Sequence, residues 1–121
     1  MEKKIIIDGK EIGFKSSAAF IMKYRSYFGS DGLLELQNLG KSEGLEAMIM
    51  MQRIIWCLAK NYNKKISTVE NWLDNFEDFD LEEIYTELEP LVVKSFGTTE
   101  KLEDGDSETS EQVIDADTKN V

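Results

Sequence analysis

The apolar residues of this chain are most concentrated between Leu45 and Asn61, in the segment LEAMIMMQRIIWCLAKN. From Ala47 to Ala59 only Gln52 and Arg53 interrupt them. Apolar positions recur with helical spacing on two sides, which predicts a central helix with little surface left for water. The two stripes are Leu45, Met48, Ile49, Gln52, Trp56 and Ala59 on one side, and Ala47, Met50 or Met51, Ile54 and Leu58 on the other.

This helix is not expected to span a membrane, because its polar residues leave no run of about 20 apolar positions. The favoured interpretation is a core helix, since apolar stripes at this spacing usually face a core. The alternative adds a partner on its methionine-rich side, because methionine adapts to irregular surfaces. In either case other elements or a partner must cover it.

The apolar and polar positions of residues 4–15 follow the pattern of a β-hairpin. Asp8-Gly9 provides the two positive-φ positions of a tight turn. An isolated hairpin is marginally stable in water, so this one is expected to lie on helices. We favour a lid over the core, with a recognition edge as the alternative. The apolar residues that share one face are Ile5, Ile7, Ile12 and Phe14.

Helix caps and glycines divide the rest of the chain. Ser16 or Ser17 is a natural N-cap for the first helix, and Gly29 is expected to end it. Gly97 is expected to end the ordered part of the chain. The expected helices cover about 17–28, 31–39, 44–61, 68–76 and 81–96.

Two capping boxes precede the last helices, one formed by Ser67 and Glu70 and one by Asp80 and Glu83. Pro90 is expected to kink or break the final helix, because proline lacks a backbone donor and clashes with the preceding turn. From Thr98 onward Thr, Ser, Glu and Asp dominate, so that residues 98–121 are expected to form a disordered acidic tail. The predicted fold is mainly α: a small helical domain, residues 1–97, with an N-terminal β-hairpin.

The net charge of −10 is unevenly distributed along the chain. Residues 1–65 carry 11 basic and 7 acidic side chains, a net charge of +4. Residues 66–96 carry 1 basic and 9 acidic side chains, a net charge of −8. Residues 97–121 carry 2 basic and 8 acidic side chains, a net charge of −6. Nucleic-acid binding by the acidic half is not expected, because phosphates repel it and affinity needs Lys and Arg contacts.

The chain has no histidine and a single cysteine, Cys57. An internal disulfide, a Cys/His metal site and a histidine-activated nucleophile are therefore excluded. Phosphate-binding glycine loops are also absent from the sequence. We expect a protein that is not an enzyme and needs no cofactor. Only three isoleucines follow Met1–Lys4, too few for a signal peptide, so we expect a cytoplasmic protein.

The acidic residues beyond the central helix alternate with apolar ones, and we interpret them as the solvated face of two helices. A calcium loop is not favoured, because the position that requires glycine is Glu83. The residues in the register of such a loop are Asp78, Asp80, Glu82 and Glu89. Trp72, Phe76 and Phe79 lie between the two capping boxes, where we favour a core role over interface anchors.

The chain resembles the tail assembly chaperones of long-tailed phages and prophages of Gram-positive bacteria. The likeness spans residues 1–97 and is closest between Ser67/Thr68 and Phe76, around Trp72, Leu73 and Asp74. The segments that carry it are, in order, DGKEIGFK, SSAAFIMKYRSYFG, LEAMIMMQRIIWCLAKN and STVENWLDNFEDFDLEEIYTELEPLVVKSFGTT. The length and acidity of residues 98–121 depart from the family pattern.

The resemblance implies a role in tail assembly. Proteins of this family bind the aggregation-prone tape measure protein before the tail tube forms around it. A longer product, often made by ribosomal frameshifting, recruits tail tube subunits. The resemblance therefore implies the tape measure protein as partner, the tail tube protein as a partner of any longer product, and a location in the bacterial cytoplasm outside the mature virion.

Surplus apolar surface suggests that client segments bind as helices in a groove. The residues predicted to contact the client are Met50, Met51, Ile54, Trp72, Phe76 and Phe79. The main alternative is an acidic inhibitor or adaptor that mimics nucleic acid and binds a basic protein. A carboxylate or metal enzyme is the weakest alternative, and self-association is left open.

Overall fold

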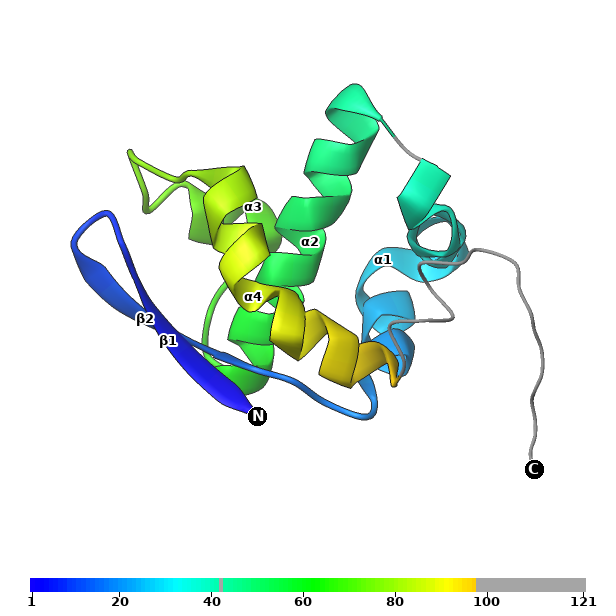
Figure 1. Ribbon diagram of the computed structural model, residues 1–121, viewed down its shortest axis with the longest axis horizontal. Coiled ribbons are helices and arrows are strands. Elements are labelled where there is room, and N and C mark those ends of the chain that lie inside the picture. Colours follow the sequence, from blue (N-terminus) through cyan, green and yellow to red (C-terminus); the bar gives the residue numbers. More distant parts are fainter. Residues whose placement is uncertain (42, 98–121) are drawn as a thin grey trace.

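A computed structural model describes residues 1–41 and 43–97 (Figure 1). Within these ranges the protein is mainly helical with an N-terminal antiparallel β-hairpin, which confirms the predicted fold class. The expected acidic tail, 98–121, lies outside the described residues. The elements are β1 (Glu2–Ile7), β2 (Lys10–Lys15), α1 (Phe20–Gln37), the 3-10 helix η1 (Leu39–Lys41), α2 (Gly44–Tyr62), α3 (Val69–Leu73) and α4 (Leu81–Phe96).

The two strands form the predicted hairpin, with Ile7 opposite Lys10 and β1 beginning at Glu2, earlier than expected. Asp8 and Gly9 have φ values of 53° and 77°, the positive pair that a type I′ turn requires. Ile5, Ile7 and Phe14 are buried against the helices. Ile6 points the other way and is 65% exposed, as the alternation of a strand dictates.

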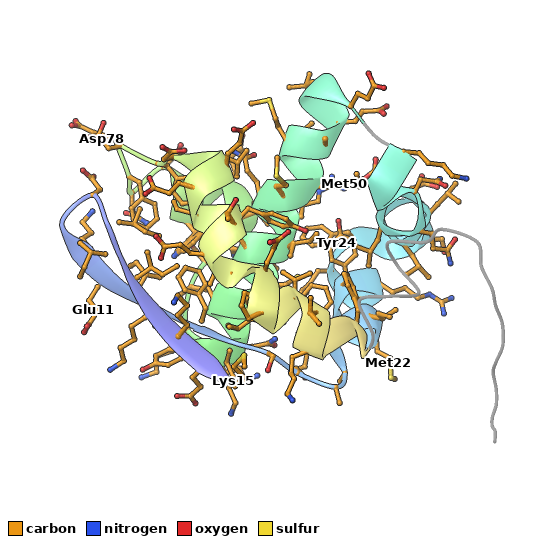
Figure 2. All side chains as sticks on the ribbon, in the orientation of Figure 1. Glu11, Lys15, Met22, Tyr24, Met50 and Asp78 are labelled. Carbon is orange, nitrogen blue, oxygen red and sulfur yellow. The ribbon has the colours of Figure 1, made fainter. Side chains whose placement is uncertain are left out.

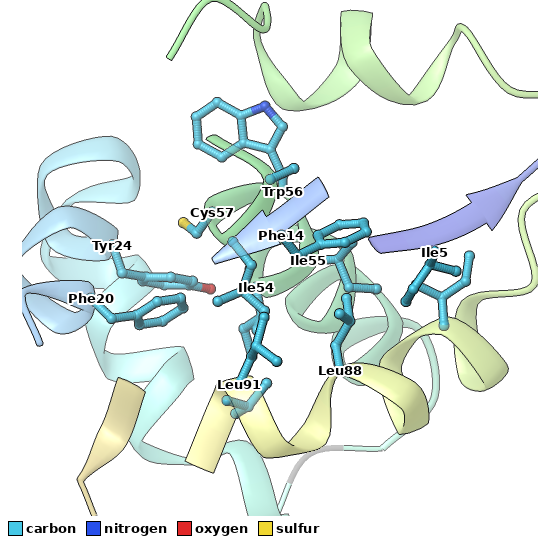
Figure 3. Packing of buried hydrophobic residues seen from close by; sticks show 14 of the residues in the cluster. Ile5, Phe14, Phe20, Tyr24, Ile54, Ile55, Trp56, Cys57, Leu88 and Leu91 are labelled. Carbon is cyan, nitrogen blue, oxygen red and sulfur yellow. The ribbon is translucent and has the colours of Figure 1, made fainter. Parts of the chain in front are cut away.

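Helix α2 lies at the centre of the core and contacts β2, α1, α3 and α4. Its residues Ile54, Ile55 and Leu58 are fully buried. Figure 3 shows side chains from three directions meeting there, with Phe14 from β2, Phe20 and Tyr24 from α1, and Leu88 and Leu91 from α4. The prediction of a central core helix is confirmed from Met50 onward, but the first turns of α2 are exposed, contrary to the expectation of little surface left for water.

The start of α1 differs from the sequence-based expectation, whereas the interruption expected at Gly29 is present. The helix begins at Phe20, because Ser17 is used in a preceding turn, where its Oγ accepts a hydrogen bond from the Ala19 amide (3.1 Å). Ser16 is buried and bonds to the Met1 carbonyl instead of capping a helix. Gly29 (φ 76°, ψ −174°) interrupts the helical conformation as expected, and it separates two helical segments within α1.

The later helices show which capping signals act. Thr68, not Ser67, caps α3: the helix begins at Val69, and the Thr68 hydroxyl accepts from the Asn71 amide. The Ser67 backbone carbonyl accepts from the Trp56 indole. Helix α3 ends at Leu73, earlier than expected. Asp80 caps α4 as predicted, accepting from the Glu83 amide at 3.2 Å.

Pro90 lies inside α4 without breaking it, contrary to one of the two expected outcomes. Both Pro90 and Thr86, four residues earlier, are exposed. The Thr86 carbonyl, which loses its helical donor, therefore faces water. Gly97 ends α4 in the left-handed conformation (φ 90°), as expected. None of the helices in residues 1–41 and 43–97 has the length and apolarity to cross a membrane.

Candidate partner-binding surface

The six residues predicted to contact a client are buried or half-buried. Met50, Ile54 and Trp72 are 1%, 0% and 5% exposed, so they face the interior. Met51, Phe76 and Phe79 are half-buried. Partner contact through these residues stays a prediction, and the three buried ones would need a rearrangement to make it.

Trp72, Phe76 and Phe79 form one aromatic cluster. The Trp72 ring centroid lies 5.2 Å from that of Phe76 and 6.2 Å from that of Phe79, both in edge-on orientation. The Lys10 ammonium lies 5.3 Å from the centre of the Phe76 ring and donates to the Asn75 carbonyl (2.7 Å). The cluster thereby fastens the loop after α3 to the hairpin, in line with the favoured core role.

Exposed apolar residues of α2 lie on the stripe that does not include Met50 and Ile54. Leu45, Met48 and Ile49 are 71%, 48% and 38% exposed, and we call them the α2 stripe. They occupy the first turns of α2, which extend beyond the neighbouring helices in Figure 1. Apolar side chains gathered on one helix face are a feature of protein interaction sites.

A pocket of about 420 Å³ opens farther along α2, and we call it the aromatic pocket. The Trp56 indole donates to the Ser67 carbonyl (2.9 Å), which fixes one wall. Tyr27 lies edge-on to Trp56, with 4.8 Å between ring centroids, and is 43% exposed. The pocket is lined by Tyr27, Phe28, Trp56, Lys60, Ile66, Ser67, Thr68 and Val69. Such an apolar concavity suits an aliphatic or aromatic anchor.

The α2 stripe and the aromatic pocket lie along the same side of α2. Ile49 and Trp56 are seven residues apart, two turns, so their side chains project in nearly the same direction. From Leu45 to Trp56 the helix rises by about 16 Å. Together, with half-buried Gln52 between them, they form a largely apolar face long enough for about three turns of a partner helix.

Two cations border this face. The Arg53 guanidinium pairs with Glu35 (2.8 Å) and lies 4.9 Å from the Phe28 ring centre. The Lys60 ammonium donates to the Ile66 carbonyl (2.7 Å) and lies 5.8 Å from the Trp56 ring. These contacts hold the pocket walls in place through cation–π attraction and hydrogen bonding.

Two buried side chains, Cys57 and Tyr24, have strongly raised pKa values. Burial raises the pKa of the Cys57 thiol to about 12, so that it stays protonated and unreactive at neutral pH. Burial also raises the pKa of Tyr24 to about 12, although the nearby Arg53 opposes the shift. Across residues 1–41 and 43–97, no cluster of His, Cys, Asp or Glu is arranged to hold a metal ion.

The buried thiol predicts a loss of stability in alkali. Unfolded Cys57 loses its proton near pH 9, whereas the folded protein keeps it until about pH 12. The unfolded state therefore binds fewer protons in this window, and the free energy of unfolding falls as pH rises. From pH 8 to 10.5 the Cys57 contribution should fall by about 2 kcal/mol.

Urea unfolding of the parent and of Cys57→Ala at both pH values checks this. Each protein is compared with itself at pH 8, which removes the cost of the cavity. The parent should lose more stability than the variant. Equal losses would show that the thiol ionises in the folded state as easily as in the unfolded state.

No family model, curated protein or solved structure matches this chain. The resemblance to tail assembly chaperones therefore rests on the sequence segments quoted above. The sequence pattern includes the residues of the α2 stripe and Trp56 of the aromatic pocket, but it does not show that they form an exposed face. Sequence periodicity drew attention to the methionine-rich stripe, whereas the open one carries Leu45, Met48 and Ile49.

Proposed function

We propose that this protein is a non-enzymatic phage tail assembly chaperone that binds the tape measure protein and keeps it soluble during tail assembly. The observation that carries the proposal is the exposed apolar face of α2, with the α2 stripe at one end and the aromatic pocket at the other. The sequence resemblance names the client. The exposed face supplies the means of holding it.

In this proposal a client helix lies lengthwise on α2. Apolar residues of the client at helical spacing cover Leu45, Met48 and Ile49, and a larger side chain enters the aromatic pocket. Each fully buried aliphatic or aromatic side chain stabilises the complex by about 1.5–3 kcal/mol before ordering costs. Apolar client surface that would otherwise aggregate is thereby covered.

The charge of the remaining surface supports a solubilising role. Residues 66–96, which form α3, α4 and their connections, carry a net charge of −8. Copies bound along a long client would present this acidic surface to solvent and repel one another. The apolar face and the acidic half thus divide binding and solubility between different parts of one small domain.

The test is co-expression with a tape measure protein, the client that the resemblance implies, followed by size exclusion of the soluble fraction. The client should be soluble only with this protein and should co-elute with it. Met48→Asp should abolish both properties, because a carboxylate on the apolar face opposes burial.

Met22→Asp is the matched control. Met22 is 76% exposed on α1, where it points outward in Figure 2, and lies outside the α2 stripe. This variant should retain the client. If the client is soluble alone, the proposal loses its main support. If the Met48→Asp variant still solubilises the client, the binding site lies elsewhere. Separate elution at low salt would favour the acidic-inhibitor alternative.

A further inference from the structure

Strand β1 has an open edge with unpaired backbone groups. The sheet has two strands, so one edge of β1 faces away from β2. Ile7 and Lys10 flank a two-residue turn and therefore exchange hydrogen bonds, and such pairs alternate with non-bonded ones. The amides and carbonyls of Glu2, Lys4 and Ile6 consequently point outward, ready to pair with another strand.

A groove of about 220 Å³ adjoins this edge, between β1 and the start of α4. Its apolar part consists of Ile5, Ile7 and Ile84, which are all less than 9% exposed, together with exposed Ile6. Asp78 lines this groove and lies near the hairpin turn in Figure 2. The lining carboxylates belong to Asp8, Asp78, Asp80, Glu83 and Glu87, and no lining residue is basic.

The charges of this groove are not neutralised within the described part of the chain. Asp8 and Asp80 accept hydrogen bonds from the backbone amides of Glu77 and Glu83. The one ion pair in residues 1–41 and 43–97 joins Arg53 to Glu35, and neither residue lines the groove. Lys10, the lysine next to the turn, bonds to the Asn75 carbonyl. The groove thus combines unpaired backbone groups, apolar side chains and uncompensated negative charge.

We propose that β1 binds an extended segment of a partner protein as a third strand, and that this segment carries Lys or Arg at alternate positions. Strand addition satisfies the outward amides and carbonyls of Lys4 and Ile6. Alternate side chains of an added strand point to the same side, so a basic series can face Asp78, Glu83 and Glu87 together. Charge complementarity selects a basic segment over an acidic one.

The position of the charges also sets the register. Lys3 and Lys4 lie at the start of β1, whereas the carboxylates of the groove gather around its Ile6–Asp8 end. The basic residues of the partner should therefore lie opposite Ile6 and the turn. This inference does not depend on the proposed chaperone function, because the α2 stripe and the aromatic pocket involve other residues.

The probe is a seven-residue peptide that alternates lysine and valine and is blocked at both ends. It is titrated into the full chain labelled with ¹⁵N. The amide signals of Lys4 and Ile6 should move most, and their hydrogen exchange should slow, because they gain acceptors. A peptide that alternates glutamate and valine should bind at least about tenfold more weakly, a difference of about 1.4 kcal/mol.

Two further comparisons separate strand addition from simple charge attraction. A lysine-valine peptide with N-methylated backbone amides keeps its charge, but its methyl groups stand where the two strands would meet and it has no donors for the Lys4 and Ile6 carbonyls. It should therefore neither pair with β1 nor slow exchange at Lys4 or Ile6. Glu83→Gln with Glu87→Gln should weaken the unmodified peptide, whereas Glu70→Gln with Asp74→Asn, outside the groove, should not. Equal binding of methylated and unmethylated peptides, or shifts that avoid β1, would overturn the proposal.

Discussion

Ile54→Asp is expected to unfold the protein, whereas Ile49→Asp on the same helix is expected to leave it folded. Ile54 is 0% exposed and lies among core side chains, so the new carboxylate would be buried without a partner. Such burial costs several kcal/mol, comparable to the roughly 5–15 kcal/mol that stabilise a domain. Ile49 is 38% exposed, so its carboxylate would reach water at a cost of about 1 kcal/mol.

Circular dichroism and urea unfolding of the two variants measure this difference. The pair is matched in residue type, substitution and helix, so helix propensity and added charge largely cancel. Folded Ile54→Asp with a normal urea midpoint would mean that α2 is rotated relative to its neighbours. An unfolded Ile49→Asp would mean that the α2 stripe is part of the core.

Phe14→Ala is expected to lower the free energy of unfolding by about 3–5 kcal/mol. Phe14 is fully buried and comes from β2, the strand that contacts α2. Its removal leaves a cavity where the hairpin meets the helices, and a hairpin released from its support is marginally stable on its own. The loss should therefore be accompanied by faster hydrogen exchange throughout β1 and β2.

Phe14→Leu is the control for this experiment, because it retains an apolar side chain and most of the volume. It should cost clearly less than the alanine variant. Urea unfolding provides the free energies, and amide exchange locates the loosening. A cost below about 1 kcal/mol for Phe14→Ala would show that the hairpin contributes little to the core.

The fold was largely predictable because its signals are local. The Asp8-Gly9 turn, the Asp80 cap and the periodicity of α2 each act within a few residues of sequence. The predicted caps at Ser16, Ser17 and Ser67 were wrong. Ser16 bonds to the Met1 carbonyl, the Ser17 hydroxyl accepts from the Ala19 amide in a local turn, and Thr68 caps α3. The Ser16 bond and the bond from the Trp56 indole to the Ser67 carbonyl join residues more than ten positions apart, so a local pattern does not contain them.

The candidate surface was harder to predict for a related reason. Helical periodicity shows that α2 has two apolar stripes, but not which one the rest of the chain covers. That choice depends on where β2, α1 and α4 pack, and these elements are distant in sequence. Ile54 and Ile49 are the same amino acid on the same helix, yet only Ile54 meets the core.

The two tryptophans of the chain give it a built-in optical readout. Trp56 forms a wall of the aromatic pocket, whereas Trp72 packs with Phe76 and Phe79 beside β2. Both indoles are about 5% exposed or less, so each emits from an apolar environment in the free protein. Fluorescence from a Trp72→Phe variant reports on the aromatic pocket, and fluorescence from Trp56→Phe reports on the aromatic cluster beneath the hairpin. Occupation of the α2 face is thereby distinguishable, without any attached dye, from events at the hairpin.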